Sequence, residues 1–162
     1  MGIDPGYAIV GYGLVRKEGN NIKPLQYGVI RTEAGKPIEE RLGEIFDDLT
    51  GLIEAFRPDS IAIEKLYFNT NEKTAINVAQ ARGVILLACN RAGVPVYEYT
   101  PLQVKMAVVG YGRAEKKQVQ EMTRSFLRLE KIPKPDDAAD ALAIAVCHAH
   151  TAGSVLYKRG EV

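Results

Sequence analysis

Residues 2–32, GIDPGYAIVGYGLVRKEGNNIKPLQYGVIRT, decide the fold class of this chain. Within them, Gly2-Ile3-Asp4-Pro5-Gly6 predicts the end of a strand that breaks into a turn, and the β-prone residues from Tyr7 to Val15 predict a hairpin. Gly19-Asn20-Asn21 is a turn-forming cluster, so the segment from about Ile22 to Thr32 is expected to return antiparallel. Three antiparallel strands therefore come first.

After these strands, helices and short strands alternate along the chain. From Pro37, apolar residues recur at helical spacing as far as Phe56, and Pro58-Asp59 closes the segment. This order predicts an α/β fold, a five-stranded mixed sheet with three antiparallel and then two parallel strands, flanked by helices. The further elements expected are strands at Ser60 to Leu66 and Val94 to Tyr99, and helices at Asn71 to Arg91, Leu102 to Val109, Lys116 to Leu129 and Asp136 to about His150.

The length and composition are typical of an ordinary globular protein. A chain of 162 residues, 46% hydrophobic and 25% charged, can bury one sizeable core, so we expect one domain at 1–150 and a fraying tail at 151–162. No apolar run is long enough to span a bilayer and no export signal precedes Gly2, so a cytoplasmic protein is expected. Cys89 and Cys147 lie in apolar stretches typical of reduced, buried thiols. The net charge of +1 neither supports nor excludes a nucleic-acid partner.

Four carboxylates are expected to meet at one end of the sheet. Asp4 ends the first strand and Glu64 lies in the fourth, and a right-handed crossover can make these two strands neighbours. Asp137 and Asp140 open the last helix three residues apart, so their side chains project from the same helical face. Four acids in one place repel one another unless a cation neutralises them, so the pattern predicts a metal site.

The chemistry of such a site is hydrolytic. Carboxylate oxygens suit Mg²⁺, with Mn²⁺ as a plausible substitute. Two such ions can clamp a phosphodiester, one activating a water and the other stabilising the leaving oxygen. The sequence therefore predicts a two-metal-ion nuclease in which Asp4, Glu64, Asp137 and Asp140 are both the catalytic residues and the metal ligands.

Each acid also has an ordinary structural explanation. Asp4 before Pro5-Gly6 is as typical of a turn as of a site. Asp137, taken singly, is more typical of a helix start, and Asp136 is assigned to the helix cap. Glu64 in an apolar strand is costly to bury, which favours function if that strand is central in the sheet. Asp140 lies on the apolar side of its helix, which again favours function.

Six segments in order along the chain carry a resemblance to the RuvC family of Holliday junction resolvases, which have an RNase H-like fold. Each segment alone is weak, but the six together are highly specific and cover nearly the whole chain. The segments are Gly2-Ile3-Asp4-Pro5-Gly6, Ile61-Ala62-Ile63-Glu64, Gln80-Ala81-Arg82-Gly83, Gln103-Val104-Lys105 with Val108-Val109-Gly110, Ala114-Glu115-Lys116, and Asp137-Ala138-Ala139-Asp140-Ala141-Leu142-Ala143.

The resemblance implies a crossover junction endodeoxyribonuclease of recombination and repair. The four catalytic carboxylates of the family fall on Asp4, Glu64, Asp137 and Asp140. The resemblance also implies a homodimer that cuts two opposed strands of a four-way DNA junction symmetrically and works beside the RuvA and RuvB branch-migration proteins.

The basic part of the chain, from Lys105 to Lys131, is the expected DNA-binding region. Gly110-Tyr111-Gly112 lets the backbone approach a phosphate just before a helix N-terminus, which favours an anion. A solvated helix face is the alternative for these charges, and the resemblance favours contact for Lys105 and Lys116. The candidate phosphate contacts are Lys105, Arg113, Lys116 and Lys117.

Tyr67 and Phe68 are expected on a loop at the rim of the site, because they follow Glu64 closely and precede the polar Asn69-Thr70-Asn71. Exposed aromatic rings there can stack on unpaired bases at a junction centre. Core packing is the ordinary role of such a pair. In the resembled family, an aromatic residue at the position of Tyr67 is implicated in junction recognition.

Two further features leave alternatives open. The helix that contains Ala81 to Cys89 is apolar nearly all round, which is equally typical of burial within one chain and of a two-fold dimer interface. His148 and His150 are more typical of packing or surface residues than of ligands, so they are assigned no catalytic role.

Three other functions compete with a junction-cutting nuclease. A phosphotransferase of the actin and sugar-kinase class shares an opening Gly-Ile-Asp-x-Gly but usually needs two such halves, and this chain has room for one. A non-catalytic junction-binding protein need not retain four converging acids. An RNA-processing nuclease of the same fold is the nearest alternative, and cleavage of a four-way DNA junction compared with structured RNA distinguishes it.

Overall fold

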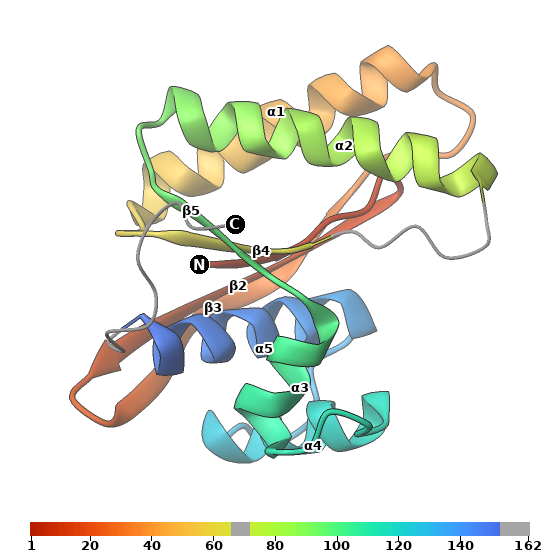
Figure 1. The fold of residues 1–162 in the computed structure, drawn as a ribbon. Helices are drawn as coiled ribbons and strands as arrows, with labels where there is room; N and C mark the ends of the chain where they lie inside the picture. The colour runs from red at the N-terminus through yellow and green to blue at the C-terminus, as the bar shows by residue number, and fades with distance from the viewer. Residues whose placement is uncertain (66–71, 153–162) are drawn as a thin grey trace.

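A computed structural model of the protein describes residues 1–65 and 72–152 (Figure 1). Its sheet has five strands in the described residues, in the order β3-β2-β1-β4-β5. The pairs β1·β2 and β2·β3 are antiparallel, and β1·β4 and β4·β5 are parallel, which confirms the predicted mixed sheet. The strands are β1 (Gly2–Asp4), β2 (Ile9–Glu18), β3 (Asn21–Arg31), β4 (Ile61–Glu64) and β5 (Val96–Tyr99).

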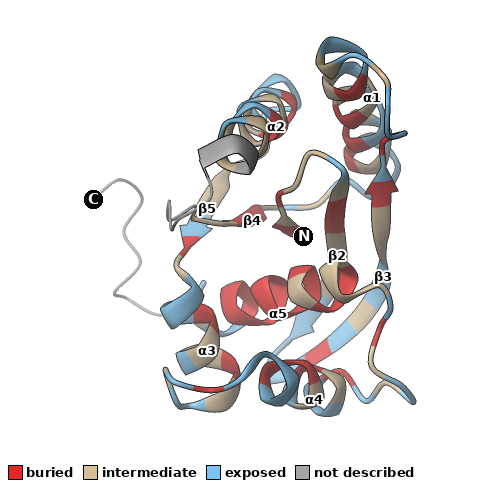
Figure 2. Ribbon diagram, turned by 90° about the vertical axis from the view of Figure 1, so that its right-hand side faces the viewer, coloured by how far each residue is buried: buried red, intermediate tan, exposed pale blue. Residues whose placement is uncertain are grey.

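Helices cover both faces of this sheet (Figures 1 and 2). On one face lie α1 (Ile38–Phe56) and α2 (Glu72–Arg91), and on the other lies α5 (Asp136–Thr151), with α3 (Pro101–Val109) and α4 (Lys116–Phe126) packed beyond it. Two cores result, since successive residues of a strand point to opposite faces. Ile61 and Ile63 join the core under α1 and α2, whereas Ala62 between them joins the core around α5.

The helices form where the apolar pattern predicts them. In α1 the buried side chains recur every fourth residue, at Arg41, Ile45, Leu49 and Ile53, which is one face of a helix. In α5 nearly every side chain after Asp137 is buried, because the helix lies between the sheet and the α3 and α4 layer. A helix that is apolar all round is expected in such a central place.

Several boundaries differ from the sequence prediction, and two of them differ by three residues. The strand β2 continues past Val15 to Glu18, because Glu18 still pairs with Asn21 and only Gly19 and Asn20 make the turn, with Gly19 at a φ of 61°. The helix α4 ends at Phe126 rather than Leu129, because Arg128 adopts a left-handed φ of 52° and turns the chain away.

Two expectations from composition can be compared with the fold. Cys89 and Cys147 are buried free thiols, as predicted. Across residues 1–65 and 72–152, the helices are too short or too polar to traverse a lipid bilayer.

Candidate active site

Asp4 and Glu64 end two neighbouring parallel strands. Gly2 pairs with Ala62 and Ile3 with Ile63, so Asp4 and Glu64 are the next residues of the two strands beyond the last pair. Both carboxylates point to the α5 face, because Ala62, two residues before Glu64, packs in the core around α5. The strand β4 lies between β1 and β5, and Ile61, Ala62 and Ile63 are fully buried. The predicted condition for Glu64, a central strand, is therefore met.

The helix α5 brings the other two acids to the same end of the sheet. It lies unusually close to β1 and β2, because glycines face it. A Cβ atom on Gly11 would lie 2.0 Å from the backbone oxygen of Asp137, and one on Gly2 would lie 2.2 Å from that of Ala141. Gly11 is also the cross-strand partner of Asp4, so this contact sets Asp137 beside Asp4. Asp140 follows one helical turn later.

The charges of these acids act on one another. The pKa of Asp4 is raised to about 8, first by burial and then by the nearby carboxylates of Glu64, Asp140 and Asp137. Burial likewise raises the pKa of Glu64, with a contribution from Asp140. Burial also raises the pKa of Asp140, against the opposing effect of Lys116. Because the pKa of Asp4 responds to the other three predicted acids, the four acids lie near one another in the structure.

Lys116, the first residue of α4, places its ammonium group at this cluster. Its Nζ atom lies 2.6 Å from Oδ2 of Asp140 and 3.8 Å from Oδ2 of Asp136. Burial lowers the pKa of Lys116, but the hydrogen bond to Asp140 and the negative charges of Asp140, Asp136 and Asp4 together outweigh this and raise the pKa overall. The lysine therefore supplies one positive charge among acids that repel one another.

Asp136 does not have the capping role predicted for it. The N-cap position is Pro135, and no side chain caps the helix there. Asp136 is the first residue of the helix itself. Its carboxylate forms an ion pair with Lys134, whose Nζ lies 2.6 Å from Oδ1 of Asp136.

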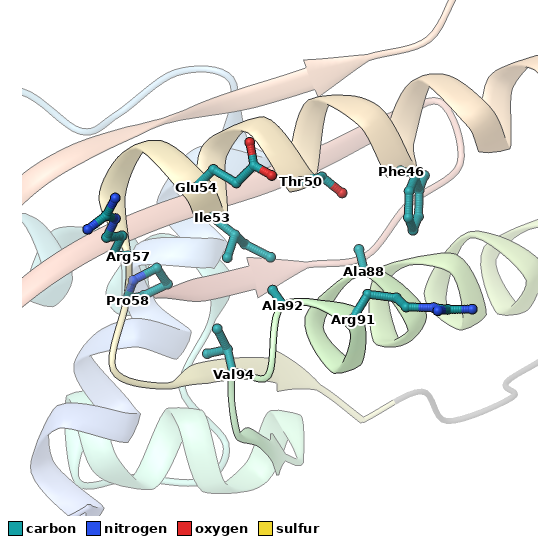
Figure 3. Close-up of a pocket in the computed structure, with 10 residues that line it drawn as sticks. All are labelled: Phe46, Thr50, Ile53, Glu54, Arg57, Pro58, Ala88, Arg91, Ala92 and Val94. Atoms are coloured by element: carbon teal, nitrogen blue, oxygen red, sulfur yellow. The ribbon is translucent and has the colours of Figure 1, made fainter.

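A cavity of about 200 Å³ opens at the acids. Its lining includes Glu64, Asp140, Lys105 and Lys116, together with apolar residues of α3 and α5. Two of the four candidate phosphate contacts thus lie at the carboxylates. A larger cavity of about 420 Å³ lies between the C-terminal halves of α1 and α2, around Thr50, Arg57 and Arg91, and includes none of the predicted site residues (Figure 3).

The other DNA-binding candidates lie farther out or outside the described chain. Arg113 and Lys117 are exposed on the segment before α4 and on its first turn. Tyr67 and Phe68 lie outside the described residues. Glu115 and Gln118 form a capping box at the N-terminus of α4. The Glu115 carboxylate therefore already accepts a hydrogen bond at the helix end where the sequence predicts that a phosphate could bind.

The donor set fits a hard divalent cation. All four side chains offer carboxylate oxygens, which are the ligands that Mg²⁺ and Mn²⁺ prefer. Among residues 1–65 and 72–152, no group of three or more His, Cys, Asp or Glu side chains is arranged as it would be around a bound metal ion. The Asp140 carboxylate is instead turned to Lys116.

His148 and His150 have the packing roles predicted for them. The ring of His148 is buried, with Nε2 at 2.8 Å from Oγ of Ser60 and Nδ1 at 2.8 Å from Oη of Tyr99. His150 packs against the edge of Phe126 at the molecular surface.

Comparison with known proteins agrees with this geometry. Residues 1–148 match the family model described as crossover junction endodeoxyribonuclease RuvC. A protein of that name from Brevibacillus brevis is 62% identical over 92% of this chain and 90% of its own length, and one from Desulfitobacterium hafniense is 57% identical over 93% and 92%.

Solved structures give the same answer. The Thermus thermophilus RuvC in complex with a Holliday junction substrate superposes with a TM-score of 0.89 at 41% identity, covering 93% of this chain and 92% of that one. A yeast mitochondrial Holliday junction resolvase shares the fold, with a TM-score of 0.67 at 15% identity over 92% of this chain and 76% of that one. The chain therefore belongs to the RuvC family of crossover junction endodeoxyribonucleases, the Holliday junction resolvases with an RNase H-like fold.

Proposed function

We propose that Asp4, Glu64, Asp137 and Asp140 are the catalytic carboxylates with which this Holliday junction resolvase hydrolyses phosphodiester bonds. One observation carries the proposal: four acids from β1, β4 and α5, which are distant in sequence, meet at one end of the sheet. Burying mutually repelling carboxylates is costly for stability, so a purely structural role is a poor explanation of the cluster.

The proposed cofactor is Mg²⁺, with Mn²⁺ as a substitute and two ions in each active site. When bound, these ions supply Lewis-acid activation of a water and stabilisation of the leaving oxygen. The oxygen-only donor set supports this choice. The raised pKa of Asp4 supports it too, because a cation next to that carboxylate restores its ionised form at neutral pH.

The chain's own residues divide the remaining tasks. Asp4 is exposed to the charge of the other three acids, since each of them raises its pKa. Lys116 and Lys105 line the same cavity as Glu64 and Asp140, where an ammonium group can hold a non-bridging phosphate oxygen.

The wider DNA-binding surface is also a proposal. Arg113 and Lys117 would contact phosphates and position the duplex, since both are exposed beside the cavity-lining Lys116. Tyr67 and Phe68 would stack on bases at the junction centre. Support comes from the relative of Thermus thermophilus, which is known in complex with a Holliday junction substrate.

We also infer the assembly in which the enzyme works. Residues 1–150 would act as one nuclease domain, and two chains would form a symmetric homodimer through α2, cut opposed strands, and work with RuvA and RuvB in the cytoplasm. The support for the interface is the outer side of α2, where Ile76 and Leu87 are 63% and 49% exposed. These residues are eleven positions apart and therefore share one helical face.

Single Asp4→Asn and Asp140→Asn variants test the catalytic assignment. Each should lose cleavage of a four-way DNA junction in Mg²⁺ yet bind the junction normally in Ca²⁺, because the amide keeps the shape but not the charge. Asp136→Asn is the matched control on the same helix, and it should cut normally. Undiminished cutting by Asp4→Asn would remove that residue from the mechanism, and faster cutting of structured RNA would favour an RNA-processing nuclease.

A further inference from the structure

Arg41 is a charged side chain in the apolar face of α1. It is the first member of the buried stripe that continues with Ile45, Leu49 and Ile53, and it is only 8% exposed. Among the described residues, no carboxylate forms an ion pair with it. A buried guanidinium without a counter-charge is costly, and an apolar side chain would continue the stripe more cheaply. Its contacts must therefore account for it.

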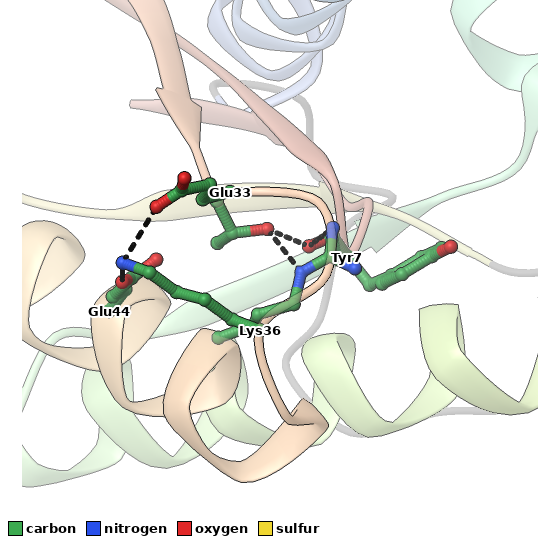
Figure 4. A network of polar contacts seen from close by, with 6 residues as sticks. Tyr7, Glu33, Lys36 and Glu44 are labelled. Carbon is green, nitrogen blue, oxygen red and sulfur yellow. Dashed lines mark hydrogen bonds and ion pairs between the residues drawn. The ribbon is translucent and has the colours of Figure 1, made fainter.

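The hydrogen bonds of the Arg41 side chain go to two residues, Thr32 and Tyr7, which are themselves hydrogen-bonded to each other. Its Nε donates to Oγ1 of Thr32 at 2.8 Å, and its Nη2 donates to the backbone oxygen of Tyr7 at 3.4 Å. The Thr32 hydroxyl donates to the same Tyr7 oxygen at 2.7 Å. The guanidinium also lies over the Tyr7 ring, 4.3 Å from its centroid. We call Tyr7, Thr32 and Arg41 the Arg41 clamp, of which Figure 4 labels Tyr7.

The clamp fixes the connection that begins at Asp4. Tyr7 lies between the end of β1 at Asp4 and the start of β2 at Ile9, and Thr32 also ties its backbone N–H to Ala8 at 3.1 Å. The connection is tight, because a Cβ atom on Gly6 would lie 2.2 Å from the backbone oxygen of Ile9. Arg41 thus holds the loop that follows Asp4 from the face of the sheet opposite α5.

We propose that Arg41, together with Thr32, is a positioning residue that orients the Asp4 carboxylate for cation binding. The inference rests on the proposed role of Asp4. Asp4 is the last residue of a three-residue strand, so its backbone is restrained on one side by the sheet and on the other by the loop that the clamp holds. Loosening the clamp leaves the fold in place and lets the carboxylate sample orientations that do not bind the cation, which lowers affinity.

Mn²⁺ binding to the protein alone tests this directly, because the electron paramagnetic resonance signal of free Mn²⁺ reports affinity without turnover. Arg41→Met keeps the length of the side chain but removes its hydrogen bonds, and Thr32→Val removes the bridging hydroxyl. Each should raise the Mn²⁺ dissociation constant by about tenfold, the lower end of the loss seen when groups that orient metal ligands are removed. Arg41→Lys should recover part of the affinity.

Two kinds of control separate positioning from stability. Ile45→Val and Ile45→Ala weaken the same buried stripe but remove none of the hydrogen bonds of the clamp, so they should lower the free energy of unfolding and leave Mn²⁺ affinity unchanged. Lys36→Met removes the neighbouring ion pairs with Glu33 and Glu44, which Figure 4 shows beside the clamp, and should also bind Mn²⁺ normally.

The outcomes are distinct. The inference is wrong if Arg41→Met and Thr32→Val both bind Mn²⁺ as the wild type does, or if an Ile45 variant of equal stability weakens binding equally. Should Arg41→Met not fold, Thr32→Val alone decides. If Asp4→Asn weakens Mn²⁺ binding while the clamp variants do not, only this inference fails. If Asp4→Asn leaves the affinity unchanged, the proposed metal site itself is wrong and the role of Arg41 falls with it.

Discussion

Gly11 of β2 and Asp137 of α5 are in backbone contact, so close that a Cβ atom on Gly11 would lie 2.0 Å from the Asp137 backbone oxygen and 3.2 Å from its Cβ atom. Side chains on both elements would normally hold the backbone of a helix farther from the backbone of a sheet. Here the missing side chain lets the first turn of α5 lie directly on the strand next to Asp4. The distance between the acids therefore depends on a glycine that carries no chemistry.

Gly11→Ala should impair cleavage more than junction binding. The added methyl group meets backbone atoms that cannot rotate away, so the start of α5 must move off the sheet and carry Asp137 with it. Overpacking of this kind costs roughly 1–3 kcal/mol of unfolding free energy. Urea unfolding and cleavage rates measure the two effects. Gly43→Ala in α1 is the control, since nothing lies within 4 Å of its Cβ position. Normal cleavage by Gly11→Ala would show that this contact does not position the acids.

Lys116→Gln should weaken junction binding most at low salt. If the ammonium group that lies 2.6 Å from Asp140 contacts a phosphate in the complex, the slope of log affinity against log salt should fall by about one. Lys134→Gln is the control, because that lysine is 72% exposed and pairs with Asp136. Fluorescence anisotropy with a labelled junction over a salt series gives the slopes, and identical slopes would reject the phosphate contact of Lys116.

The meeting of the four acids could be predicted from the sequence, because strand order and helical spacing are local patterns. The alternation of strands and helices makes β1 and β4 neighbours, and the three-residue spacing of Asp137 and Asp140 gives them a common face. Residue type alone was misleading at Asp136, which resembles a cap but lies inside the helix and pairs with Lys134.

Two features depend on contacts that no local pattern reveals. Gly11 and Gly13 lie in the segment from Tyr7 to Val15 that predicts a hairpin, whereas in the fold they face α5 together with Gly2. Their spacing of two along a strand, opposite an alanine-rich helix, is the signal that points to this contact. No pattern in the sequence assigns a role to Arg41, because its partners Thr32 and Tyr7 lie next to strand ends that only the folded sheet brings to it.

His148 predicts how stability depends on pH. Burial lowers its pKa from the usual 6.5 to about 4. Above pH 6.5 the ring is neutral in both the folded and unfolded states. Between pH 6.5 and 4 only the unfolded state takes up the proton, so stability falls as pH falls, and the loss stops below pH 4. At 1.36 kcal/mol for each pH unit the full effect is about 3 kcal/mol.

The comparison of wild type with His148→Gln isolates this contribution, since the carboxylates change with pH in both proteins. The free energy of unfolding of the wild type should fall relative to the variant between pH 6.5 and 4. His150→Gln, at an exposed position of the same helix, should follow the wild type. Parallel curves for wild type and His148→Gln would contradict a neutral buried ring.

Leu87→Glu should separate the proposed dimer into monomers. Ile76 and Leu87 form an exposed apolar stripe on α2, and Gly83 between them has open space around its Cβ position, so a second helix can approach closely there. A carboxylate at Leu87 would be buried without a partner in such an interface and would repel its copy. Leu25→Glu is the matched control, because Leu25 is similarly exposed, at 47%, but lies on β3.

Sedimentation at micromolar concentration should show a dimer for wild type and Leu25→Glu and a monomer for Leu87→Glu. The monomer should nick one strand of a junction without the coupled second cut, and a Leu87→Glu protein that still sediments as a dimer would place the interface elsewhere.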